Sequence, residues 1–266
     1  MMLATVRLII ASGVIMSSVA FSSVKTEPVE YKQGDDKFEG FIVYPEKAKE
    51  PVPGILMVHN WLGNSDETRH QAERIAALGY VVFAADIYGK GVRPKDQKEA
   101  AQLATIYKND RKKFRDRLQA GLATLRRQRG VDPTRVIAVG YCFGGTGVLE
   151  LARSGADIKG VVSFHGGLDS PTPDDGKNIK SEVLVLAGAD DPLQKSDDLH
   201  AFEKEMRSHH LAWQLIMYGG AVHSFTDRSA GNDNSKGTAY NANADRRSFE
   251  AFKQFASELF GPTPAT

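Results

Sequence analysis

The chain has 266 residues, of which 41% are hydrophobic and 25% are charged, and its formal net charge is +1. This composition is typical of a globular protein that buries a sizeable core, and it excludes intrinsic disorder, collagen-like repeats and coiled coils. The charge balance argues against nucleic acid as the main partner, because phosphate binding usually requires a basic excess. A single cysteine excludes a disulfide framework and a cysteine-rich zinc site.

The first twenty residues have the pattern of a targeting segment. Arg7 precedes an apolar stretch over residues 8–20, and the small residues Ser18 and Ala20 stand two apart, as cleavage sites require. The stretch is short for a bilayer span and is diluted by serine and glycine. We therefore expect a secretory signal over residues 1–20, export to the periplasm or the medium, and no membrane association after its removal. An uncleaved anchor and a buried helix are the alternatives.

Strands and helices alternate along the rest of the chain. Short apolar runs predict strands at 38–44, 54–59, 80–85, 135–139, 160–164, 182–187 and 213–217. Helical spacing predicts helices at 65–78, 96–129 with a break near Asn109, 145–153, 198–208 and 245–260. This alternation predicts one α/β domain over residues 31–262, after an N-terminal extension at 21–30. We expect a mostly parallel central sheet with helices on both faces and ligands bound at the carboxyl ends of its strands.

Residues 135–145 read RVIAVGYCFGG, a predicted strand followed by Gly-x-Cys-x-Gly and a predicted helix. This is the form of a nucleophile elbow, with cysteine where serine is more usual. The sharp turn leaves almost no room for a side chain two positions before and two positions after Cys142. Glycine stands at both positions, as Gly140 and Gly144. The turn directs the backbone N–H of Phe143 to the same point, and the helix N-terminus favours a thiolate. We predict Cys142 as the nucleophile; the alternative is a small, inert core residue.

An elbow nucleophile is followed along the chain by an acid and then by a histidine. Asp190 and Asp191 come directly after the strand predicted at 182–187, and His223 lies in a glycine-rich loop before the last helix. The Asp-Asp-Pro segment alone would suit a solvated turn. The residue types, their order and the flanking elements together predict a triad of Cys142, His223 and Asp191, with Asp190 as the alternative acid.

The other six histidines are expected to have structural or surface roles. His59 and His165 end predicted strands and are expected in the core, with a pocket-lining role as the alternative for His165. The remaining four are predicted on helix faces or at a helix end, in contact with solvent: His70, His200, His209 and His210.

These motifs resemble those of the dienelactone hydrolase family of α/β-hydrolases. The resemblance covers roughly residues 31–260 and is carried by PGILMVHNWLGNS (53–65), GYVVFAADIYGKG (79–91), VGYCFGG (139–145), GADDP (188–192) and GGAVHSF (219–225). It implies the α/β-hydrolase fold and a small-molecule ester or lactone as substrate, with no metal or organic cofactor. It further implies that Cys142 attacks the carbonyl to form a thioester, that His223 exchanges protons and that Asp191 orients His223. The backbone N–H groups of Phe143 and Trp61 would hold the oxyanion.

The chain departs from the family pattern near the expected thiol. The family has a glutamate after the second strand that is thought to contact the resting thiol, and this chain has Asn60 there. Asn60 cannot take a proton. We therefore expect Cys142 to rest either as a plain thiol or as a thiolate paired with protonated His223.

A second departure concerns the charge of the substrate. The family arginines that bind the dienelactone carboxylate align with Lys90, which keeps the charge but not the bidentate fork, and with Asp227, which reverses it beside Arg228. These departures argue against the ring-cleavage dienelactone as the substrate and leave open whether it is accepted. Lys90 and Arg93 either attract an anionic ester or lie in a solvated loop.

Two other functions fit the same residues. One is an acyltransferase or thioesterase that uses the same site. The other is a non-catalytic binding protein that has retained the fold, which the loss of the glutamate at Asn60 keeps open. The sequence leaves the physiological substrate and the oligomeric state open.

Overall fold

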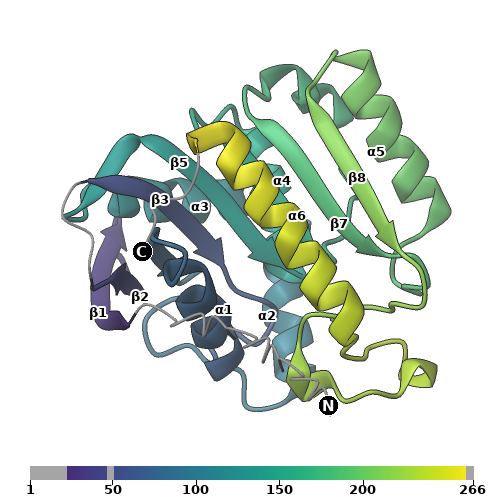
Figure 1. The fold of residues 1–266 in the computed structure, drawn as a ribbon, viewed down its shortest axis with the longest axis horizontal. Helices are drawn as coiled ribbons and strands as arrows, with labels where there is room; N and C mark the ends of the chain where they lie inside the picture. The colour runs from purple at the N-terminus through teal and green to yellow at the C-terminus, as the bar shows by residue number, and fades with distance from the viewer. Residues whose placement is uncertain (1–22, 47–50, 262–266) are drawn as a thin grey trace, which may run out of the picture.

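The computed structural model describes residues 23–46 and 51–261, so the expected signal segment lies outside the described residues. Eight strands form one sheet in the order β1-β2-β4-β3-β5-β6-β7-β8 (Figure 1). β2 pairs antiparallel with both β1 and β4, and all other neighbours run parallel, which confirms the predicted mostly parallel sheet. The strands are β1 (Val24–Gln33), β2 (Asp36–Pro45), β3 (Val52–Val58), β4 (Val81–Ala85), β5 (Val131–Tyr141), β6 (Gly160–Phe164), β7 (Glu182–Gly188) and β8 (Trp213–Tyr218).

Each predicted helix is present, with its ends shifted by a few residues. The break expected near Asn109 falls at Asp110, whose backbone N–H closes one helix and whose carboxylate accepts from Lys113 N at 2.9 Å to begin the next. None of the helices in the described ranges is both long and apolar enough to cross a membrane. The helices are α1 (Asp66–Ala76), α2 (Gln97–Asn109), α3 (Arg111–Arg126), α4 (Phe143–Arg153), α5 (Ser196–Ser208) and α6 (Ala242–Phe260), with short 3₁₀ turns η1 (Pro173–Asn178), η2 (Arg228–Ala230) and η3 (Asn234–Lys236).

The N-terminal end of the domain differs from the sequence prediction. Most of the segment expected as an extension at 21–30 belongs to β1, which pairs along its whole length with β2. β1 is an edge strand with the sequence VKTEPVEYKQ, in which only Tyr31 is buried. Charged side chains and a proline are typical of an edge that avoids pairing with other chains, and they hide the strand from a search for apolar runs.

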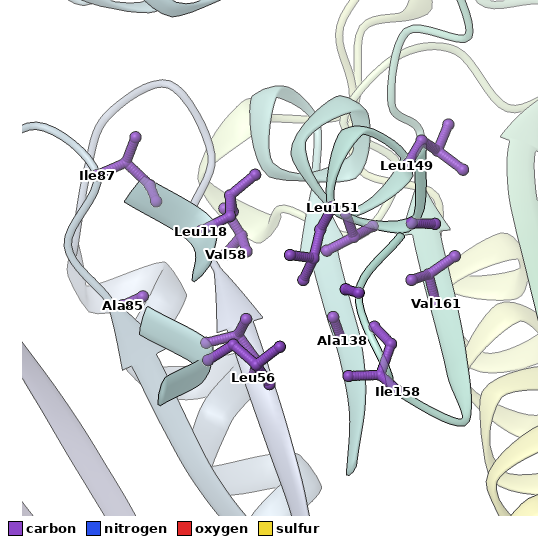
Figure 2. Packing of buried hydrophobic residues seen from close by; sticks show 14 of the residues in the cluster. Leu56, Val58, Ala85, Ile87, Leu118, Ala138, Leu149, Leu151, Ile158 and Val161 are labelled. Atoms are coloured by element: carbon purple, nitrogen blue, oxygen red, sulfur yellow. The ribbon is translucent and has the colours of Figure 1, made fainter. Parts of the chain in front are cut away.

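The sheet is covered on both faces because successive side chains of its central strands are apolar and point to opposite faces. In β3, Ile55 and Met57 face α1 and α6, whereas Leu56 and Val58 face α2, α3, α4 and α5. Figure 2 shows Leu56 and Val58 on this second face, in the same cluster as Leu118 of α3. Since both faces are filled, the loops at the carboxyl ends of the strands are the region left for a site.

The start of α1 carries a serine cap beside the loop that follows β3. The Ser65 hydroxyl accepts from Thr68 N at 3.4 Å, and two acidic residues follow in the first turn. Because this contact is long, we expect Ser65→Ala to lower the free energy of unfolding by only about 0.5–1 kcal/mol. Urea unfolding measures the change, with Ser208→Ala at the exposed C-terminal end of α5 as the control. Equal shifts of the two midpoints would contradict a capping role.

Candidate active site

Cys142 lies at the turn between β5 and α4 and has a backbone conformation unusual for a residue with a side chain. Its φ is 54° and its ψ is −112°. The Cys142 N–H donates to Phe164 O at 2.9 Å, and its carbonyl accepts from Thr146 N at 3.2 Å. Strained backbone of this kind persists only where the surrounding structure holds it. The thiol is therefore fixed at the carboxyl end of β5.

The two glycines of the turn are required by close backbone contacts. A Cβ on Gly140 would lie 2.0 Å from Gly144 O, and a Cβ on Gly144 would lie 2.2 Å from Val58 O. Both distances are far below van der Waals contact, and both neighbours are main-chain atoms. The structure thus confirms that the positions two residues before and after Cys142 have no room for a side chain.

Two backbone segments meet near the sulfur. The Phe143 ring is buried and stacks on Phe114 with 4.6 Å between the ring centroids, and Phe143 begins α4 directly after Cys142. Trp61 follows β3, and its carbonyl accepts from the Tyr88 hydroxyl at 2.9 Å. Trp61 and Phe143 line the same cavity as Cys142. The geometry thus brings both expected oxyanion donors to this cavity.

Cys142, His223 and Asp191 form a continuous chain of contacts. His223 Nε2 lies 3.0 Å from Cys142 Sγ, and His223 Nδ1 lies 2.8 Å from Asp191 Oδ2. The side chains of His223 and Asp191 are 8% and 5% exposed. Asp190, the alternative acid, instead accepts from Gly220 N at 2.9 Å and supports the turn before His223. Asp191 is therefore the carboxylate that reaches the histidine.

The electrostatics of the three groups favour a charged pair. Burial lowers the pKa of His223, but the hydrogen bonds to Asp191 and Cys142 outweigh it and raise the pKa to about 10. Burial raises the pKa of the Cys142 thiol, but the hydrogen bond and charge of His223 outweigh this effect and hold it below its usual value. Each group thus favours the ionised form of the other.

The two buried histidines at strand ends are uncharged. Ile87 N donates to His59 Nε2 at 3.2 Å, so the proton of His59 is on Nδ1, which donates to Asn60 O at 2.6 Å. Burial lowers the pKa of His59 to about 4, which fits the predicted core role. His165 Nε2 lies 2.9 Å from Thr226 Oγ1, and its ring lies edge-to-face with His223 at 5.2 Å. Its pKa is well lowered by burial and by His223. His165 lines a cavity at Cys142, which was the alternative role expected for it.

The expected substrate contacts at Lys90 and Arg93 are not brought to the site. Lys90 pairs with Glu30, and Arg93 lies 3.6 Å from Asp86. The loop after β4 turns back over β2, where Lys90 N donates to Lys37 O at 2.8 Å. Both cations are therefore held against the antiparallel edge of the sheet, away from the cavities that contain Cys142.

Asn60 is also outside those two cavities. It lines a small neighbouring cavity with Gln71, His165 and Thr226. Its side-chain Oδ1 accepts from Leu62 N at 2.9 Å, and its carbonyl accepts from Gly63 N. Asn60 thus stabilises the turn that carries Trp61, a role the sequence did not indicate.

Two cavities that open onto Cys142 and His223 include residues that the sequence did not single out. Their volumes are about 360 and 400 Å³, and Lys108 and Leu193 line both. Asp227 borders the first, where its carboxylate accepts from Ser229 N at 2.8 Å. Within residues 23–46 and 51–261, no group of three or more His, Cys, Asp or Glu residues is placed to hold a metal ion.

The chain is similar to known proteins over most of its length. The dienelactone hydrolase family matches residues 38–260. A probable 2-oxo-3-(5-oxofuran-2-ylidene)propanoate lactonase of Bradyrhizobium sp is 28% identical over 184 residues, 65% of this chain and 73% of that protein. The solved structure of a protein named m3DLH is similar with a TM-score of 0.86 and 37% identity, covering 89% of this chain and 99% of that one. A dienelactone hydrolase-like promiscuous phosphotriesterase from metagenomic libraries has a TM-score of 0.84 and 38% identity, covering 90% and 99%.

Proposed function

Because this chain belongs to the dienelactone hydrolase family, whose members act on lactones and esters, we propose that it cleaves a small ester or lactone through a thioester on Cys142. One observation carries the proposal. The sulfur of the sole cysteine lies 3.0 Å from a histidine nitrogen, and the other nitrogen of that ring lies 2.8 Å from a buried carboxylate. Nucleophile, base and orienting acid are thereby within hydrogen-bonding reach of one another.

In the first half of the reaction, the Cys142 thiolate attacks the carbonyl carbon and a C–S bond forms. The electron pair of the carbonyl moves to its oxygen, where the N–H groups of Phe143 and Trp61 donate hydrogen bonds. Each such donor contributes about 3–4 kcal/mol to stabilising the oxyanion. The intermediate then collapses, the bond to the leaving oxygen breaks, and His223 Nε2–H protonates that oxygen.

In the second half, neutral His223 takes a proton from water, and the resulting hydroxide attacks the thioester carbon. The C–S bond breaks, the carboxylic acid leaves, and the thiolate is again paired with protonated His223. Asp191 accepts from Nδ1–H throughout, which keeps the ring oriented and stabilises its positive form. The raised pKa of His223 and the lowered pKa of Cys142 support this resting pair.

Trapping of the acyl-enzyme tests the proposal. Rapid quenching with acid after mixing with p-nitrophenyl acetate is expected to give one acetyl group per chain, mapped by mass spectrometry to Cys142, followed by release of acetate. If an added alcohol or thiol takes the acetyl group faster than water does, the protein is an acyltransferase. An unmodified Cys142 with no p-nitrophenol release would favour a binding protein.

The resting ion pair has its own signature in the pH dependence of thiol alkylation. Because the pKa of Cys142 is lowered, we expect iodoacetamide to modify it with a midpoint below about pH 8.5, the ordinary value of a free thiol. In His223→Ala the lowering effect of the imidazolium is lost while burial remains, so the midpoint is expected to move above about pH 8.5. Asp191→Asn, which keeps the ring but weakens its charge, is the matched control and is expected between the two. A midpoint near pH 8.5 in all three proteins would indicate a plain thiol.

A further inference from the structure

The two cavities at Cys142 have a common border and different outer walls. They share Cys142, His223, Lys108 and Leu193. Leu193 follows directly after Asp191-Pro192 and is 62% exposed. The space around the sulfur therefore has two parts, and Leu193 lines both of them.

Apolar residues from three elements line the first cavity, which we call the apolar cavity. Trp61 and Leu62 come from the turn after β3, Ala101 and Ala104 from α2, and Phe143 from the start of α4. Polar residues also line it, from α2 (Gln97, Thr105 and Lys108) and from the loop after β8, where the Asp227 carboxylate already accepts from both the backbone and the hydroxyl of Ser229. This cavity suits a hydrocarbon group, which gains from leaving water without a hydrogen-bond partner.

Charged residues of both signs line the second cavity, which we call the polar cavity. Outside the Cys142–His223 pair, its cations and anions are equal in number: Lys108, Arg111 and Lys195 against Asp169, Asp191 and Asp198. Arg111 pairs with Asp169, and Asp191 is engaged by His223. Such a wall offers donors and acceptors together with no excess of charge. Hydroxyl groups, which both donate and accept, fit it better than a single ion.

The expected oxyanion donors place the reacting carbonyl of an ester at the apolar cavity. The acyl group keeps its carbonyl oxygen at the N–H groups of Phe143 and Trp61, and both residues line the apolar cavity. The leaving oxygen must meet His223, which lines both cavities. We propose that the substrate is the ester of an apolar acyl group with a hydroxyl-rich alcohol, that is, an acylated polyol. The acyl chain occupies the apolar cavity and the polyol occupies the polar cavity. This inference rests on the proposed function and names its substrate class.

Four esters and two variants test the proposal. The esters distinguish the effects of the acyl chain length, of the hydroxyl groups and of a negative charge on the rate. They are glycerol monohexanoate, glycerol monoacetate, ethyl hexanoate and the anionic hexanoyl ester of glycolate. For the unmodified chain we expect kcat/KM for glycerol monohexanoate to exceed that for each of the other three about tenfold or more. Ala101→Trp and Gln194→Trp are matched, since each residue lies outside the core and lines one cavity only.

The two variants are expected to have opposite effects. Ala101→Trp fills the apolar cavity and should lower kcat/KM for both glycerol monohexanoate and ethyl hexanoate about tenfold, with little change for glycerol monoacetate. Gln194→Trp fills the polar cavity and should lower kcat/KM for both glycerol esters about tenfold, with little change in kcat/KM for ethyl hexanoate. Equal losses on all substrates in both variants would overturn the assignment of the two cavities. A preference for the glycolate or the ethyl ester in the unmodified chain would overturn the polyol.

These outcomes are distinct from failure of the proposed function. If the unmodified chain hydrolyses esters and labels Cys142 but does not discriminate among the four, only the substrate assignment fails. If none of the four is hydrolysed and p-nitrophenyl acetate leaves Cys142 unlabelled, the thioester mechanism fails with it.

Discussion

Replacing Cys142 with alanine is expected to lower the turnover of a neutral ester by about 10⁴-fold or more. The thioester cannot form without the sulfur, and His223 at 3.0 Å then has no nucleophile to pair with. What remains is binding and the two backbone N–H donors, which in comparable sites retain only a small part of the rate. Initial rates of p-nitrophenyl acetate hydrolysis measure the loss.

A double variant shows whether Cys142 and His223 act as one unit or contribute to the rate independently. If Cys142 and His223 act as one unit, Cys142→Ala combined with His223→Ala should lose no more activity than Cys142→Ala alone. Thermal unfolding of each variant serves as the control for correct folding. A Cys142→Ala protein with a rate within tenfold of the unmodified chain would place ester hydrolysis elsewhere in the molecule.

The candidate site was largely predictable because it depends on local patterns at strand ends. The glycines around Cys142, the Asp pair after β7 and the glycine-rich loop at His223 each follow a recognisable strand. In a mostly parallel sheet the carboxyl ends of the strands lie at one edge, so residues 81 and 32 positions apart meet there: 142 with 223, and 191 with 223. The choice between Asp191 and Asp190 needed coordinates, since adjacent residues point in different directions.

The substrate contacts were not predictable in the same way, because a loop's direction depends on tertiary packing. Nothing in the segment around Lys90 and Arg93 shows that it folds back over β2 and pairs with Glu30 and Asp86. The sequence of α2 contains a weak signal that one face of this helix lines the site. Gln97, Ala101, Ala104 and Lys108 recur at helical spacing along one face, yet only the structure shows that this face borders Cys142.

Gly144→Ala is expected to lower the free energy of unfolding by about 3 kcal/mol and to remove most of the activity. The added Cβ would lie 2.2 Å from Val58 O and 2.6 Å from His59 O. Both oxygens are main-chain atoms at the end of the central strand β3, so neither can rotate away as a side chain would. Relief requires the start of α4 to move away from β3.

That movement would carry the nucleophile with it, because Cys142 precedes α4 and its carbonyl begins the helix. A displacement of about 1 Å at a reacting group lowers a rate about 10²-fold, so activity is expected to fall more than stability alone would explain. Gly219→Ala is the matched control, since no atom lies within 4 Å of its Cβ position and its φ is outside the left-handed region. Urea unfolding and ester hydrolysis on both variants separate the two effects. The contact that excludes a side chain at Gly144 is also expected to fix Cys142 against β3. A Gly144→Ala protein with full activity would therefore show that the tight turn does not position the sulfur.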